Sequence, residues 1–326
     1  MDLEGRLLPS FAHLPVVTPK DFQPPEVRRA QMAPLFRRAC AERVLPEGHA
    51  IENLIVAGPP DSSPLILRQY RPAARTRGAA ILYFHGGGFT VGSLDAAQAT
   101  CIALAETVGC IVYSVDYRLA PEHPYPAALE DGYAALLALA DRAEVDGFDA
   151  LRIAVAGSSA GGAIAASVAI AARDRYGPKP CYQALSCPML DDRLETLSAR
   201  TFVAVPVYSR FQAQASWAAY LNGKDMPAAA PARVARVDGL PPACIIAAEL
   251  DPLRDEAIEY ARRLMASNIP AGLHMFSGAP HGFDVVAPDA PASRLAFNIL
   301  CAGLSDAFDR PFHSLHGVID ESRAIS

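Results

Sequence analysis

The 326-residue sequence predicts an α/β protein in which a mostly parallel central sheet is flanked by helices and covered by a helical cap. From about residue 50 onward, short runs of β-type residues alternate with segments of helical periodicity. Most of these β-type runs are continuously apolar, which is typical of strands buried on both faces of a parallel sheet. Two stretches that break the alternation supply the expected cap.

The strands are expected where apolar or β-branched residues run together between turn-forming residues. The second of them alternates apolar with polar residues, whereas most of the others are apolar throughout. In chain order the expected strands are Ile51–Val56, Leu65–Tyr70, Ala79–Phe84, Ile111–Val115, Ile153–Ala156, Tyr182–Ser186, Ala243–Ala248 and Leu273–Phe276.

The helices are expected between and after these strands, and the last begins just after Pro291, a residue that is well tolerated at a helix start. Strands that alternate with helices form mainly parallel sheets, with the helices packed on the sheet faces. The expected helices are Ala96–Val108, Ala127–Ala143, Ala160–Arg175, Arg254–Ser267 and Ala292–Ala307.

The cap is expected from two stretches outside this alternation. The first 45 or so residues lack strand patterns and carry an amphipathic segment around Val27–Val44, and Asp191–Ala235 is helical and bears aromatic residues. Because ligands bind beyond the carboxyl ends of the strands in open α/β sheets, an insertion after a strand lies above the site. We therefore divide the chain into an N-terminal helical cap segment (1–48), a core (49–190), a cap insertion (191–235) and the C-terminal part of the core (236–326).

Composition excludes several classes of protein. The net charge is −6 and lysines and arginines do not cluster, which argues against a nucleic-acid partner. No run of about 18 apolar residues predicts stable membrane insertion, and the acidic N-terminus lacks the apolar core of a secretory signal. The seven cysteines are scattered without a CxxC pair, which favours reduced, buried thiols and a cytoplasmic location.

The strongest chemical signal is the segment Gly157–Gly162, which follows the strand Ile153–Ala156 and precedes a helix-forming run. It matches G-x-S-x-G, in which a nucleophilic serine occupies a sharp turn between strand and helix. Ser159 would then lie at a helix N-terminus, where backbone N–H groups favour developing negative charge. A chance match or a helix-packing glycine cluster is the alternative, and the strand and helix on either side favour the catalytic interpretation.

A second signal, His85–Phe89, follows the strand Ala79–Phe84 and contains three consecutive glycines. Glycines adopt positive φ and leave backbone N–H groups unshielded, so such a loop suits an oxyanion hole completed by Ala160, the residue after the nucleophile. By itself the loop could be an ordinary flexible turn. Its occurrence together with the serine turn favours the catalytic role.

A serine nucleophile needs a general base, which in turn needs an acidic partner. Eight histidines compete for the base: His13, His49, His85, His123, His274, His281, His313 and His316. His281 follows the last expected strand in a turn-rich segment, whereas His274 lies within that strand. Asp251 directly follows the strand Ala243–Ala248, whereas Asp255 lies inside the next helix. The order Ser159, Asp251, His281 is the order expected in α/β-hydrolases.

Taken together, these motifs resemble the hormone-sensitive-lipase-like esterases, the branch of the α/β-hydrolases that carries an HGGG loop. The resemblance runs from about Ile81 to Phe283. The segments that carry it are His85–Phe89, Asp116–Ala127, the serine turn, Gly239–Ala243, Asp251–Glu256 and His281–Phe283. It implies the α/β-hydrolase fold, hydrolysis of a small-molecule carboxylic ester without metal or organic cofactor, and a homodimer.

The resemblance also implies a role for each motif residue. Ser159 would be the nucleophile, His281 the general base and Asp251 the group that orients the imidazole. The amides of Gly87, Gly88 and Ala160 would form the oxyanion hole, with His85 and Gly86 supporting the loop. One position departs from the family pattern, because Ser158 stands where the family usually has Asp or Thr. Ser158 is not the expected nucleophile, since only Ser159 has the required flanking glycines.

Aromatic residues in the cap insertion fall at helical spacing, which indicates packing of the cap on the core or the lining of an apolar pocket. The candidate pocket residues are Phe89, Ser158, Leu190, Tyr208 and Phe211. A capped pocket favours short-chain acyl or small aromatic esters. A lactone hydrolase with the same triad is the alternative, and a ligand-binding receptor on the same fold is a more remote one.

Overall fold

The computed structural model describes residues 5–21, 23–42, 45–74 and 77–309. Within these ranges eight strands form one sheet in the order β10-β9-β7-β6-β4-β5-β3-β2. The strands are β2 (Ala50–Val56), β3 (Leu65–Arg71), β4 (Ala80–Phe84), β5 (Ile111–Val115), β6 (Ile153–Ser158), β7 (Tyr182–Ser186), β9 (Ala243–Leu250) and β10 (Ala271–Pro280). The neighbouring strands from β10 to β5 pair parallel. β3 pairs antiparallel with β5, and β2 pairs antiparallel with β3. The expected mostly parallel sheet is confirmed.

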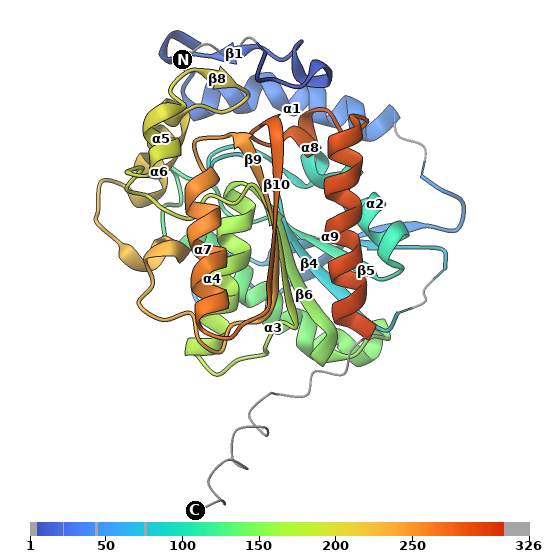
Figure 1. Ribbon diagram of the computed structural model, residues 1–326. Coiled ribbons are helices and arrows are strands. Elements are labelled where there is room, and N and C mark those ends of the chain that lie inside the picture. The colour runs from blue at the N-terminus through green and yellow to red at the C-terminus, as the bar shows by residue number, and fades with distance from the viewer. Residues whose placement is uncertain (1–4, 22, 43–44, 75–76, 310–326) are drawn as a thin grey trace, which may run out of the picture.

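Helices cover both faces of this sheet, as Figure 1 shows. The helices are α1 (Pro25–Glu42), α2 (Leu94–Val108), α3 (Ala127–Asp146), α4 (Ala160–Asp174), α5 (Leu197–Thr201), α6 (Arg210–Leu221), α7 (Arg254–Ala266), α8 (Phe283–Val286) and α9 (Pro291–Asp309). One hydrophobic core contains side chains of α3, α4 and α7, and another contains side chains of α2 and α9. Every residue of β4, β5 and β6 is buried, which accounts for the continuous apolar runs in the sequence.

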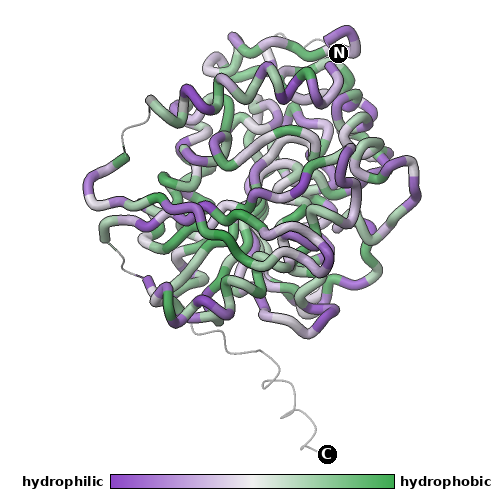
Figure 2. The backbone as a smooth tube through the Cα atoms, turned by 180° about the vertical axis from the view of Figure 1, so that it is seen from behind, coloured by the Kyte–Doolittle hydropathy of each residue, from purple (hydrophilic) through white to green (hydrophobic). Residues whose placement is uncertain are grey.

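The chain leaves its hydrophilic residues largely outside these two cores. Seen from behind in Figure 2, many of the hydrophilic stretches follow the outline of the molecule. All seven cysteines are free thiols, and Cys40 is half-buried while the other six are buried, as expected. No helix in the described ranges combines the length and the apolar composition that a bilayer crossing requires.

The last strand is longer than the sequence predicts. β10 continues past Phe276 to Pro280 and pairs with the end of β9 through a register irregularity. Ser277 and Gly278 interrupt the apolar pattern there, and Gly278 has a φ of 67°, so periodicity does not reveal the extension. His281 therefore follows the strand immediately.

The expectation that the N-terminal segment lacks strands is wrong. Val16–Val17 (β1) pairs antiparallel with Val205–Pro206 (β8) of the cap insertion. A two-residue strand is too short to show an alternating pattern, and its partner is distant in the sequence. The pairing joins the two predicted cap segments, which lie side by side beyond the carboxyl ends of the parallel strands, with α1 running across that end of the sheet (Figure 1).

Parts of the predicted domains fall outside the described residues. These parts are residues 1–4, 22 and 43–44 of the N-terminal cap segment (1–48), residues 75–76 of the core, and residues 310–326 of the C-terminal part of the core, which include His313 and His316.

Candidate active site

Ser159 occupies the turn between β6 and α4 with φ of 55° and ψ of −120°. Such a conformation in a residue other than glycine costs about 1–3 kcal/mol and persists only where the surroundings enforce it. Here the N–H of Ser159 donates to the carbonyl of Ser186 at 2.9 Å, and its own carbonyl accepts the N–H of Met189 at 3.1 Å. The end of β7 and the residues after it therefore hold the serine at the N-terminus of α4.

The motif glycines allow the backbone to pack closely at this turn. A Cβ added to Gly157 would lie 2.4 Å from the carbonyl carbon of Gly161, and one added to Gly161 would lie 2.1 Å from the carbonyl oxygen of Phe84. Neither position tolerates a side chain. The same close packing brings the glycine loop to the serine, since a Cβ on Gly86 would lie 3.5 Å from the Cβ of Ser159.

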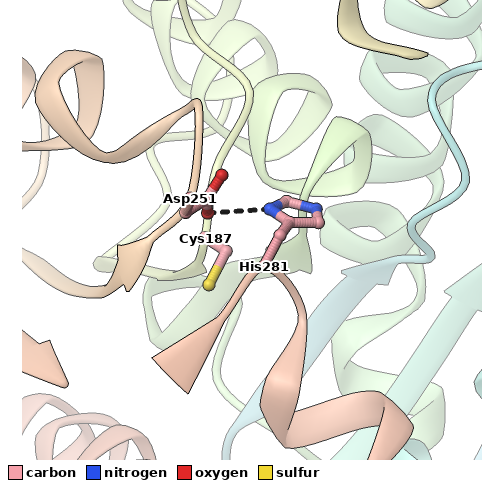
Figure 3. A group of neighbouring side chains, drawn as sticks. All are labelled: Cys187, Asp251 and His281. Atoms are coloured by element: carbon pink, nitrogen blue, oxygen red, sulfur yellow. Dashed lines mark hydrogen bonds and ion pairs between the residues drawn. The ribbon is translucent and has the colours of Figure 1, made fainter. Parts of the chain in front are cut away.

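Three side chains from separate loops meet at this turn. His281 Nε2 lies 2.9 Å from Ser159 Oγ, and His281 Nδ1 lies 2.8 Å from Asp251 Oδ2. Figure 3 shows Asp251 and His281 pointing toward each other. The other oxygen of Asp251 accepts the N–H of Leu253 at 2.8 Å. Because the carboxylate is an acceptor, we assign the proton of the neutral imidazole to Nδ1, which leaves Nε2 free to accept the serine proton. All three residues are buried.

Cys187 lies next to the Asp251–His281 pair (Figure 3), and potential ligand atoms of these three residues lie within 4.8 Å of one another. Metal binding requires a thiolate. Burial, reinforced by the charge of Asp251, raises the pKa of the Cys187 thiol well above its ordinary value. Since Asp251 and His281 are already joined by a hydrogen bond, this environment favours proton transfer over metal ligation.

The glycine loop leaves backbone donors available beside Ser159. Gly87 and Gly88 have φ of 128° and 60°, and the carbonyl of Gly87 accepts the N–H of Val91 at 3.0 Å. In the described ranges the amides of Gly87 and Gly88 donate no backbone hydrogen bond. The amide of Ala160, at the first position of α4, has no intrahelical acceptor. The three amides predicted as oxyanion donors are therefore free of backbone acceptors, as that role requires.

His85 contacts the glycine loop and not the triad. Its ring stacks on Tyr117 with 4.3 Å between ring centroids, and its Nδ1 lies 2.9 Å from the carbonyl oxygen of Gly86. The Tyr117 hydroxyl donates to the carbonyl of His85 at 2.7 Å. Burial lowers the pKa of His85 to about 4, so its ring is neutral at neutral pH. These contacts support the predicted role of His85 in holding the loop.

We expect Gly87→Ala to lower kcat for an ester substrate by at least about 10²-fold, the usual effect of losing one oxyanion donor. A Cβ at this position would lie 2.1 Å from the carbonyl oxygen of Val91, so the loop must move away from Ser159. Steady-state kinetics would measure the loss. Gly223→Ala is the matched control, because Gly223 also has a positive φ, of 72°, but nothing lies within 4 Å of the added Cβ. Equal losses in the two variants would contradict the expectation.

Sequence reasoning missed Arg29, which links α1 to the glycine loop. Its guanidinium donates to the carbonyls of Thr90 and Ala120, each at 2.6 Å, and to both carboxylate oxygens of Glu122, each at 2.8 Å. The segment just after the predicted oxyanion loop is thereby attached to the N-terminal cap. Nothing local in the sequence distinguishes Arg29 from Arg28.

Sequence reasoning also assigned no role to Glu256, although it lies in the recognised segment Asp251–Glu256. Its Oε1 accepts the N–H groups of Leu190 at 2.6 Å and Asp191 at 3.2 Å. Burial raises the pKa of Glu256 well above its ordinary value. Glu256 therefore holds the chain that follows β7, close to the residues that support the serine turn.

Of the predicted pocket residues, Tyr208 packs against His281. Its ring centroid is 4.7 Å from that of His281, and its hydroxyl donates to Ser216 at 3.0 Å. Phe89 instead stacks on Tyr220 of α6 with 3.9 Å between ring centroids. This stack joins the glycine loop to the cap insertion.

The remaining pocket candidates have different surroundings. Leu190 is fully buried in the core and is fixed through its N–H by Glu256. Phe211 is half-buried at the start of α6. Ser158 lines a different cavity, between α2 and α9. The other four candidates do not line the cavity that Ser158 lines.

Comparison with known proteins identifies the family. Residues 81–285 match a family model described as alpha/beta hydrolase fold. The chain is 40% identical over 255 residues to esterase LipI of Mycobacterium tuberculosis, covering 76% of this chain and 79% of the relative. It is 34% identical over 232 residues to an ethyl acetate hydrolase of Pseudomonas putida, covering 68% and 72%.

Among solved structures, a bacterial heroin esterase superposes with a TM-score of 0.87 at 34% identity, covering 94% of this chain and 99% of that one. The chain therefore belongs to the α/β-hydrolase family, and it is a carboxylesterase of the hormone-sensitive-lipase-like branch.

Proposed function

We propose that this carboxylesterase uses Ser159, His281 and Asp251 as its catalytic triad and acts on short-chain acyl or small aromatic esters. The observation that carries the triad is the chain of hydrogen bonds from Asp251 through His281 to Ser159, at 2.8 and 2.9 Å. It ends on a serine held in a strained turn at the N-terminus of α4.

In the first half of the reaction, Ser159 Oγ attacks the ester carbonyl carbon while its proton moves to His281 Nε2. Asp251 stabilises the resulting imidazolium and keeps the ring in place. His281 then protonates the oxygen of the leaving alcohol, which leaves an acyl group on Ser159. In the second half, water attacks this acyl-enzyme by the same steps and releases the carboxylic acid.

The developing oxyanion is stabilised by the amides of Gly87, Gly88 and Ala160. Each such donor contributes about 3 kcal/mol to transition-state stabilisation in comparable hydrolases. The donors are backbone groups whose positions are set by the glycine loop and the helix start, so little reorganisation accompanies the reaction.

The cap supports the proposed preference for small esters. Tyr208 lies against His281, and the exposed fractions of Ser159, His281 and Tyr208 are 6%, 4% and 6%. The N-terminal segment is attached above the site by β1 pairing with β8 and by Arg29. A covered site restricts long acyl chains, in keeping with a relative named for hydrolysis of ethyl acetate.

We also infer a cytoplasmic location, because seven free thiols suit a reducing compartment. The homodimer that the resemblance implies stays a prediction.

The acyl preference can be tested with p-nitrophenyl esters from acetate to palmitate. We expect kcat/KM to be highest for short acyl chains and to fall steeply for long ones. A maximum at long chains would contradict the proposed preference. Absence of hydrolysis at every length, together with turnover of lactones, would favour the lactonase alternative. A covalent serine probe that fails to label Ser159 would favour the receptor alternative.

A further inference from the structure

The turn that carries His281 is attached to the sheet by a short hydrogen bond. His281 follows the end of β10, Gly282 has a φ of 61°, and α8 begins at Phe283. Asp284 lies in α8, three residues after His281, and its Oδ2 accepts the hydroxyl of Ser186 at 2.6 Å. Because Ser186 is the last residue of β7, this bond joins the histidine turn to the end of a central strand.

Ser186 also holds the nucleophile, through its backbone. Its carbonyl accepts the N–H of Ser159 at 2.9 Å. Ser186 is itself fixed by the sheet, since β7 pairs with β6 and β9 and the register places Ser186 opposite Ser158 and Ile246. The end of β7 is therefore a common support. It holds Ser159 through a backbone bond and the turn of His281 through a side-chain bond.

The bond between Asp284 and Ser186 lies in the protein interior. Ser186 is buried, and Oδ1 of Asp284 is also buried, with no hydrogen-bond partner of good geometry among the described residues. Burial raises the pKa of the Asp284 carboxyl above its ordinary value, and the bond from Ser186 opposes this shift. Because a buried acceptor is costly to leave unpaired, the hydroxyl of Ser186 strongly favours this position of Asp284.

Two further contacts act on the imidazole ring of His281. Asp251 binds its Nδ1 at 2.8 Å, and the ring of Tyr208 packs on it with 4.7 Å between ring centroids. These contacts orient the ring, but they leave the place of the backbone to the contacts of the turn. That place matters, because Nε2 must remain within reach of Ser159 Oγ, now 2.9 Å away. A displacement of about 1 Å at a catalytic group can cost about 10²-fold in rate.

We propose that Asp284 is a positioning residue of this esterase. By accepting the hydroxyl of Ser186, it holds the turn of His281 against the end of β7, at the distance from Ser159 that proton transfer requires. Asp284 acts through Ser186 and through the backbone of the turn, and it takes no part in the proton transfer itself. The inference rests on the proposed function, because it assumes that His281 accepts the proton of Ser159.

Asp284→Ala should lower kcat and kcat/KM for p-nitrophenyl acetate together, by about 10- to 100-fold, because the geometry of proton transfer matters in the transition state and not in substrate binding. Ser186→Ala removes the other half of the bond and should cause a similar loss. Asp284→Asn keeps an oxygen that can accept the Ser186 hydroxyl, so kcat should return to within about threefold of the wild type. A covalent serine probe counts the active enzyme in each preparation.

The double variant Asp284→Ala/Ser186→Ala tests whether the two residues act through one bond. It should be no slower than either single variant by more than about twofold, since the effects of two hydrogen-bonded partners do not add. Asp289→Ala is the matched control, because Asp289 is an exposed acid before α9 whose backbone carbonyl accepts a bond from Arg294. Its kinetics should match the wild type. Rates are taken on the plateau of each pH profile, because Asp284 and His281 interact electrostatically.

The outcomes separate this inference from the proposed function. Wild-type kinetics in Asp284→Ala or in Ser186→Ala would overturn the positioning role and leave the triad intact. An Asp284→Asn enzyme as slow as Asp284→Ala would overturn it too, as would a double variant whose loss is the product of the two single losses. If Ser159→Ala hydrolysed the ester as fast as the wild type, the proposed triad itself would fail, whatever the Asp284 variants showed.

Discussion

Replacing Ser159 with alanine should lower kcat/KM for p-nitrophenyl acetate by about 10⁴- to 10⁶-fold, as for other serine hydrolases that lose the nucleophile. The variant keeps the oxyanion donors but has no atom to form the acyl-enzyme. It should fold normally, because the backbone bonds from Ser159 to Ser186 and Met189 do not involve its hydroxyl. Steady-state kinetics and thermal unfolding of the same preparation would check both statements.

Ser167→Ala is the matched control, since Ser167 is another buried serine on α4 that is 6% exposed. It should retain wild-type kinetics. If Ser159→Ala kept substantial activity, the nucleophile would have to be sought elsewhere, first at the neighbouring Ser158. Labelling by a covalent serine probe followed by peptide mapping would then identify it.

Asp251→Asn should lower kcat by about 10⁴-fold, the size of the effect of the same change in a serine protease. The cause is a change of tautomer. Oδ1 of Asp251 accepts the N–H of Leu253 at 2.8 Å, so the asparagine oxygen would remain there and its NH₂ group would face His281. Nδ1 would have to accept a hydrogen bond, the ring proton would move to Nε2, and Nε2 could no longer accept the proton of Ser159.

Asp255→Asn provides the comparison, because Asp255 accepts the N–H of Ser198 at 2.7 Å and a bond from Arg254, without touching His281. Its kcat should stay within about tenfold of the wild type, since partly exposed pairs of this kind contribute little. An Asp251→Asn enzyme that kept a tenth of the wild-type kcat would refute the tautomer argument and with it the proposed role of Asp251.

The sequence by itself determined the sheet and located the three residues that we propose as the triad. Strands buried on both faces must be continuously apolar, so the periodicity of β4 to β7 and β9 indicated a mostly parallel sheet. Catalytic loops in such a sheet follow the carboxyl ends of strands. Ser159, Asp251 and His281 could therefore be located one at a time, and the structure brings them within hydrogen-bond distance.

The tertiary structure alone decided how this site is covered and lined. The pairing of β1 with β8, the bonds from Arg29 to the loop after Phe89, and the stack of Phe89 on Tyr220 join segments far apart in the sequence. Such contacts depend on how whole elements pack, and no local pattern of residue types encodes them, whereas strand periodicity and a tight catalytic turn are set by neighbouring residues.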